Sequence, residues 1–208
     1  AGSAAGDKGA PIFHDFADAI APAAKLIVQD AGFIGGDNCA QRPGIGCPVQ
    51  ITPILDQSYK QGARIHVNPW GDRQGTPMGF TPPTANYSQA ARDVDAFVFS
   101  HPEMLVVFNT GNSAASALPP PASSVSAPGS AKNTLQVGGT RGLPGRDDSY
   151  IGGGLIGPTR DGRIKPDLAG PAWVTAGDAR VVLDGSLCGT SDQTGTSVSP
   201  CSPAIWAW

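Results

Sequence analysis

The sequence predicts an α/β protein, a doubly wound parallel sheet with helices on both faces. Two observations predict this fold class. Strand-like apolar runs alternate with helix-like amphipathic runs in the order β, α, β, α, β. The clearest run, residues 104–109 (MLVVFN), is apolar up to its last residue, as expected of a strand whose sheet is covered on both faces. Ligands of such sheets bind at the carboxyl ends of the strands.

Three further strands are expected from short apolar runs. Residues 25–29 (KLIVQ) predict a buried strand, and residues 64–68 (RIHVN) and 134–137 (TLQV) predict two more, the last leading into two glycines. Residues 68–86 are rich in glycine and proline and predict a loop.

Two helices are expected between these strands. Thr52 can cap the first, with Pro53 at its first helical position and Gly62 at its end. Its apolar face consists of Ile51, Ile54, Leu55 and Tyr59. The second helix is expected to begin near Asn86, with Gln89 three residues on as in a capping box. Its apolar face consists of Ala90, Val94, Phe97 and Val98.

The composition indicates one globular domain. The 208 residues are 40% hydrophobic and 15% charged, which suits a single core. A net charge of -3 and the absence of a Lys/Arg cluster give no electrostatic support for a nucleic acid or an anionic membrane as partner. No apolar run approaches the roughly 20 residues of a membrane span. No signal peptide is visible, and the chain begins at Ala1 without Met.

The four cysteines leave two interpretations open. Cys39 and Cys47 lie in one loop and either close a short disulfide, as in an oxidising, secreted setting, or remain free thiols. The spacing of these two, Cys188 and Cys201 with the three histidines matches no zinc pattern. We therefore expect no structural metal.

Ser197, in residues 195–200 (GTSVSP), is the candidate nucleophile. A serine on a glycine-led turn at the start of a helix faces free N–H groups and the positive end of the helix dipole. The alternative is a flexible Gly/Ser/Thr turn. An earlier GTS at residues 189–191 runs into Asp192 and lacks the proline that follows Ser197.

Asn112 is the candidate oxyanion donor, because it lies in the Thr110, Gly111, Asn112 loop that directly follows the strand at residues 104–109. A side-chain amide on a loop at a strand end can stabilise the oxyanion of an acyl-transfer transition state. The alternative is a turn residue that tolerates a left-handed conformation.

Six segments together resemble the subtilisin-like serine proteases, or subtilases. In chain order they are residues 20–30 (IAPAAKLIVQD), 66–71 (HVNPWG), 104–114 (MLVVFNTGNSA), 126–140 (SAPGSAKNTLQVGGT), 157–171 (GPTRDGRIKPDLAGP) and 195–200. The resemblance implies a secreted, extracellular endopeptidase that forms an acyl-enzyme. It assigns the nucleophile to Ser197 and the oxyanion hole to Asn112 and the Ser197 backbone N–H.

The resemblance also implies a peptide or protein substrate that lies as an extended strand beside the chain. The implied substrate-binding residues are Val67, Asn68, Trp70, Gly71 and Gly111. No cofactor is implied. Calcium is common in the family, but no acidic cluster of the D-x-D-x-D kind marks a site in this sequence.

The family's triad order is Asp, His, Ser, and residues 1–6 (AGSAAG) resemble the stretch immediately after its histidine motif. We therefore expect residues 1–208 to be a partial catalytic domain without the N-terminal Asp and His, and inactive alone. Structural or surface roles are expected of His14, His66 and His101. Prolines 200 and 203 replace the start of the family's long helix after the nucleophile, which favours a truncated or frame-shifted end.

Two departures concern the segments themselves. Pro69 stands where the family has Ser, and its ring removes a backbone donor from the strand that should bind substrate. Ala172 replaces a family glycine, so the turn there is expected to differ.

Two other classes of function compete. One is a catalytically inactive relative that binds peptides or serves as a scaffold. The other is an unrelated doubly wound nucleotide-binding protein, which is disfavoured because no strand is followed by G-x-G-x-x-G or a P-loop.

Overall fold

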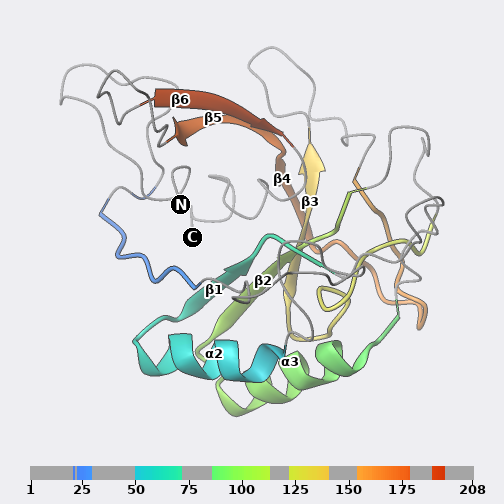
Figure 1. Ribbon diagram of the computed structural model, residues 1–208. Helices are drawn as coiled ribbons and strands as arrows, with labels where there is room; N and C mark the ends of the chain where they lie inside the picture. Colours follow the sequence, from blue (N-terminus) through green and yellow to red (C-terminus); the bar gives the residue numbers. More distant parts are fainter. Residues whose placement is uncertain are drawn as a thin grey trace, which may run out of the picture.

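The computed structural model describes residues 21, 23–29, 50–71, 86–112, 122–140, 154–178 and 189–194, the backbone alone for 173–178 and 189–194. Strands β1 (Ile65–Asn68), β2 (Leu105–Asn109), β3 (Leu135–Thr140) and β4 (Leu168–Pro171) form a parallel sheet in that order. Strands β5 (Trp173–Asp178) and β6 (Gly189–Thr194) pair antiparallel beyond the carboxyl end of β3 (Figure 1). The predicted α/β class with a parallel sheet is confirmed.

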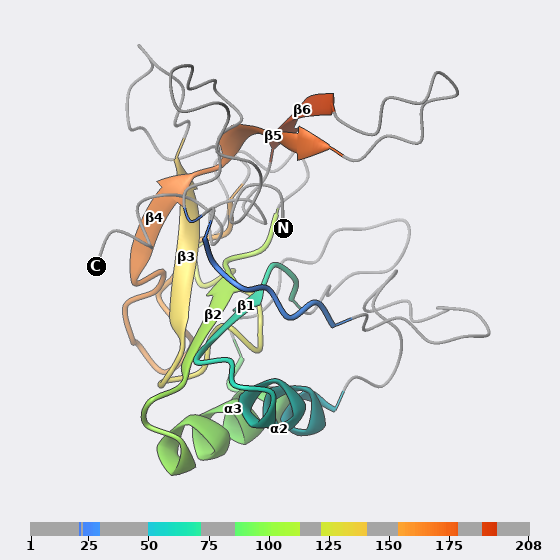
Figure 2. The ribbon, with the colours of Figure 1, turned by 90° about the vertical axis from the view of Figure 1, so that its left-hand side faces the viewer.

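Helices α2 (Ile51–Lys60) and α3 (Gln89–Ser100) pack side by side (Figure 2). Their buried side chains share a hydrophobic core with Val106 and Phe108 of β2. Because side chains alternate along a strand, Val107 points to the opposite face, where it is also fully buried. The expectation of helices on that opposite face falls outside the described residues. Neither α2 nor α3 has the length and apolar character needed to cross a membrane.

Helix α2 begins one residue before the predicted cap. Gln50 is the N-cap and makes no side-chain capping bond, so the prediction of Thr52 as cap is wrong. Pro53 still lies in the first turn, where its missing N–H costs nothing. The end is as predicted. Gly62 adopts φ +99°, and the N–H groups of Gly62 and Ala63 donate to Tyr59 O and Ser58 O, which is a Schellman motif.

Helix α3 begins three residues after Asn86, and Ser88 is its cap. The Ser88 hydroxyl accepts a hydrogen bond from the N–H of Ala91 at 3.2 Å. The predicted capping box is therefore wrong, because Gln89 is itself the first helical residue. Of the predicted apolar face, Val94 and Phe97 are buried and Ala90 and Val98 half-buried, while Ala91, which was not predicted, is fully buried.

Residues 25–29 do not form the buried strand expected of them. Leu26, Ile27 and Val28 are 47%, 41% and 79% exposed, and their backbone enters no ladder. An apolar run becomes a strand only where a neighbouring edge pairs with it, which the sequence of the run does not reveal. Gln29 makes polar contacts with α2 and β1.

Strand β3 is longer than predicted and continues through Gly138 and Gly139 to Thr140. Pairing with β4, which was not predicted, extends it, because Gly138 lies opposite Ala169 and Gly139 opposite Gly170. Ladder hydrogen bonds thus compensate for two residues of low strand propensity.

A buried ion pair fixes the start of β3. The Lys165 side chain is 3% exposed, and its Nζ donates to Thr134 O at 2.8 Å and to Asp167 Oδ2 at 2.6 Å. Asp167 Oδ2 also accepts the backbone N–H of Gln136 at 2.7 Å. Burial lowers the pKa of Lys165, and the bond to Asp167 opposes that shift. The ammonium is therefore stable there only with its carboxylate partner.

Removing the two partners of this pair should have unequal effects on stability. Asp167→Ala leaves a charge buried without its partner and should lower the free energy of unfolding by about 3 kcal/mol. Lys165→Met should cost only about 1 kcal/mol, because Asp167 is one-third exposed and can be hydrated. Urea unfolding measures both. Asp56→Ala, in the exposed pair with Lys60, is the control and should change little. Equal losses for the two Lys165–Asp167 variants would contradict this account.

Candidate active site

The structure brings together two of the predicted site segments. Val67 and Asn68 end β1, opposite Val107 and Phe108 of β2. Gly71 follows β1, and Gly111 and Asn112 follow β2. The two segments therefore lie at the same carboxyl edge of the sheet, where ligands bind in α/β proteins. Ser197, the predicted nucleophile, lies outside the described residues, as do His14, the four cysteines and the C-terminal tail.

A third segment, not predicted as part of the site, packs against both. The N–H of Ser126 donates to Thr110 O at 3.0 Å. A methyl group on Gly71 would lie 2.4 Å from Ser126 Oγ, and one on Gly111 would lie 3.1 Å from it and 2.8 Å from Leu155. Gly111 also has φ +93°, a conformation that favours glycine. Glycine is therefore needed for these three segments to approach one another.

A fourth segment completes the frame around Asn112. The N–H of Leu155 donates to Gly111 O at 3.2 Å, and Asn112 forms an antiparallel bridge with Gly154. The N–H of Ser124 in turn donates to Ile156 O at 2.8 Å. The backbone of Gly111 and Asn112 is thus paired with a neighbouring segment, and Asn112 itself is exposed. An exposed asparagine just beyond the carboxyl end of a parallel strand is a candidate oxyanion donor.

The side chains of two predicted substrate-binding residues point into the protein. Asn68 is 1% exposed and donates from Nδ2 to His66 Nδ1 at 2.9 Å and to Val107 O at 3.3 Å. Trp70 packs edge-on against Phe108, with ring centroids 5.5 Å apart. Any contact of Asn68 with a peptide must therefore run through its backbone, whereas Trp70 is half-buried and keeps part of its side chain exposed. Pro69, between them, is exposed and follows the last residue of β1.

His66 is neutral and held between two amides. Gln29 Nε2 donates to Ile54 O at 3.0 Å, so Gln29 Oε1 faces His66 and accepts from its Nε2 at 2.9 Å. The other ring nitrogen, Nδ1, then accepts from Asn68. Burial lowers the pKa of His66 from 6.5 to about 4, and the bond to Asn68 opposes the shift. Both ring nitrogens are engaged, which leaves His66 no role as a base.

His101 lies at the other end of the sheet. It caps α3, four residues before β2 begins, and stacks on Phe97 at 4.2 Å between ring centroids. Asn112 lies beyond the opposite end of β2. Within the described ranges, therefore, no histidine adjoins Asn112, and no three His, Cys, Asp or Glu residues gather as a metal site would require.

Ser126 and Gly154 were the site residues that sequence reasoning missed. Both lie in or beside segments that resemble the family, at residues 126–140 and 157–171, and that likeness was the available signal. The earlier GTS, at residues 189–191, lies within β6. It is therefore part of a strand, not a turn that opens a helix.

The parallel sheet, its two helices and this strand-end frame are consistent with a subtilisin-like α/β fold. The profile of the subtilase family (peptidase S8) matches residues 2–201. The chain therefore belongs to the subtilase family, as the six segments predicted. No curated protein sequence matches it.

Solved structures similar to the chain include the prenylagaramide maturation protease PagA, at 16% identity and a TM-score of 0.48, with 73% of this chain and 44% of that chain covered. A mutant of the protease domain of PatA is 15% identical, with a TM-score of 0.48, and the match covers 73% of this chain and 44% of that one. Sphericase is 15% identical, with a TM-score of 0.43, and the match covers 76% of this chain and 46% of that one. The chain thus spans less than half the length of these proteins.

The low pKa of His66 predicts a loss of stability in acid. The unfolded chain takes up a proton near pH 6.5, whereas the folded chain does so only near pH 4. The free energy of unfolding contributed by this residue is therefore complete above pH 6.5 and falls by about 3 kcal/mol as the pH drops to 4. Urea unfolding between pH 7 and 4 measures it. His66→Gln should flatten the profile by that amount, and an unchanged slope would contradict the prediction.

Proposed function

We propose that the protein is a serine endopeptidase that cleaves peptide bonds through an acyl-enzyme. Ser197 Oγ attacks the scissile carbonyl, and the Asn112 side-chain amide with the Ser197 N–H holds the oxyanion. The observation that carries the proposal is the frame around Asn112, in which the packing of Gly111 against Ser126 positions an exposed asparagine at the carboxyl edge of the sheet. Membership of the subtilase family supports it.

The substrate lies as an extended strand beside the end of β1 and the segment after β2. β1 is the outermost strand of the described sheet, so a peptide can add to its edge through backbone hydrogen bonds. Val67, Asn68, Trp70 and Gly71 contribute backbone atoms on one side and Gly111 on the other. Pro69 offers only a carbonyl, so pairing skips one donor there.

The base and its orienting carboxylate come from a histidine and an aspartate outside this chain, as the triad order of the family implies. A serine without such a base is a weak nucleophile at neutral pH. Residues 1–208 are accordingly a partial catalytic domain and inactive alone. The complete enzyme acts outside the cell, in keeping with the secreted character that the resemblance implies.

The nucleophile is tested with a fluorophosphonate probe, which labels activated serines, and a fluorogenic peptide. The protein extended through its native coding sequence should be labelled and should cleave the peptide, and Ser197→Ala should abolish both. Residues 1–208 alone should do neither. Labelling that survives Ser197→Ala would sink the assignment. Peptide binding without hydrolysis by the extended protein would favour the non-catalytic, peptide-binding relative instead.

The oxyanion donor is tested by Asn112→Leu in the extended protein. Because the amide bonds to the substrate oxygen most strongly once negative charge develops there, kcat should fall about 10²- to 10³-fold while KM changes little. Steady-state kinetics on the fluorogenic peptide separate the two constants. Gln57→Leu, which removes an exposed amide on α2, is the matched control and should leave both unchanged. A rise in KM at constant kcat would assign Asn112 to ordinary substrate binding.

A further inference from the structure

We propose that Gln136 is a positioning residue for this active site, whose buried amide joins the end of β2 to the Ser126 segment. The inference rests on the proposed function only for its effect on catalysis. Gln136 lies on β3, opposite Phe108, and is fully buried. Its Nε2 donates to Asn109 O at 3.3 Å and to Ser126 O at 3.2 Å. Both hydrogens of the NH2 group are thus used across two different segments.

The two acceptors are the points that determine the site geometry. Asn109 lies three residues before Asn112, at the end of β2. Ser126 is the residue on which Gly71 and Gly111 both pack. A single amide therefore fixes the distance between the strand that leads to the oxyanion donor and the segment that supports it.

The surroundings of the amide favour a fixed position. A methyl group on Gly129 would lie 2.6 Å from Gln136 Nε2 and 2.9 Å from Phe108 Cβ, so the chain passes closely over the amide at this glycine. Gln136 Oε1 is buried without a hydrogen-bond partner. Turning the amide over would place that oxygen against two carbonyl oxygens. The unsatisfied oxygen is therefore the cost of having both N–H donors engaged.

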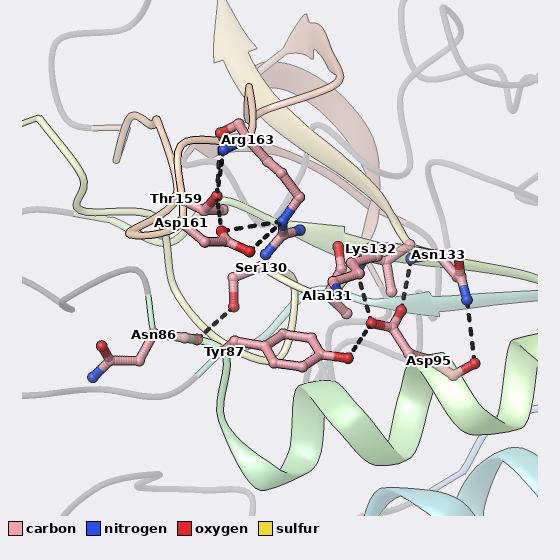
Figure 3. A network of polar contacts seen from close by, with 11 residues as sticks. Asn86, Tyr87, Asp95, Ser130, Ala131, Lys132, Asn133, Thr159, Asp161 and Arg163 are labelled. Atoms are coloured by element: carbon pink, nitrogen blue, oxygen red, sulfur yellow. Dashed lines mark hydrogen bonds and ion pairs between the residues drawn. The ribbon is translucent and has the colours of Figure 1, made fainter.

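The chain between Ser126 and β3, called the loop below, is also held by groups other than Gln136. The effect of Gln136 on the site can therefore be measured separately from release of this loop. Figure 3 shows the far end of the loop tied to α3 by Asp95, whose carboxylate accepts the N–H groups of Lys132 and Asn133 and the hydroxyl of Tyr87. The Thr134 hydroxyl lies within hydrogen-bonding distance of Gly129 O and Ala131 O, at 3.0 and 3.2 Å. None of these contacts reaches β2. Loss of Gln136 should therefore loosen the site without releasing the loop.

The test compares Gln136→Met with Thr134→Val in the extended protein. Both variants keep side-chain volume and remove hydrogen bonds to loop carbonyls, but only the first removes a link to β2. In Gln136→Met, the amide hydrogens of Ser126 and Leu155 should exchange about tenfold faster than in wild type, while the exchange rates in α3 stay unchanged. NMR measures these rates. Its kcat should fall about 10- to 100-fold with KM nearly constant. Thr134→Val should show neither effect.

Gln136→Glu gives a pH-dependent measurement that a purely packing role of this residue would not affect. An ionised carboxylate would face two carbonyl oxygens, whereas the protonated form can donate to one of them, so burial should raise its pKa. The ratio of its kcat to that of wild type should rise as the pH is lowered from about 8 to 5. If Gln136→Met does not fold, this pH profile of the Gln136→Glu variant decides the question. If the protein has no activity, the ratio of the amide exchange rates of Gln136→Glu and wild type is followed over the same pH range instead.

The inference is overturned if Gln136→Met matches Thr134→Val in exchange and kcat, or if the Gln136→Glu ratio is flat with pH. Failure of the proposed function is a distinct result. It would appear as a wild-type protein without hydrolysis, while amide exchange at Ser126 and Leu155 still reports whether Gln136 positions the two segments.

Discussion

The buried, irregular segment of residues 124–131 is the constraint on which the rest of the site depends. Backbone polar groups that leave water without helix or strand partners must find others, or the fold loses about 1–3 kcal/mol for each. Three neighbours supply them here. Beyond Gly154, Ile156 O accepts the N–H of Ser124. Thr110 O accepts the N–H of Ser126, and the Gln136 amide donates to Ser126 O. The segment is thereby hydrogen-bonded to its neighbours although it is neither helix nor strand.

This constraint links stability to chemistry. The groups that satisfy the buried segment are the ones that hold Gly111 and Asn112 in place, so the candidate oxyanion donor is positioned by the packing of the core. Two close approaches, at Gly71 and Gly111, leave no room for a side chain. Asn112 lies exposed at the end of this frame. An oxyanion donor held in this way would need no rearrangement when charge develops.

Local patterns predicted much of the scaffold. Continuous apolar residues predicted β2, and the glycine at position 62 predicted the end of α2, because both signals act within a few residues. Predictions failed where a distant partner decides. Residues 25–29 have the composition of a strand but lie exposed, and β3 continues through two glycines because β4 pairs with them. The predicted helix caps lie two residues from the observed ones, Gln50 and Ser88, since helix ends are the least sharply encoded part of a helix.

The sequence by itself determined the class of sheet, the family, and the placement of Asn112 after a strand, since each is written in contiguous residues or in ordered segments. Tertiary structure alone decided that Ser126 meets Gly71 and Gly111, that His66 is neutral between two amides, and that Gln136 spans two segments. These are contacts between residues far apart in the chain. These contacts depend on the register of the strands and on which buried polar groups hydrogen-bond to one another. No local sequence pattern encodes either.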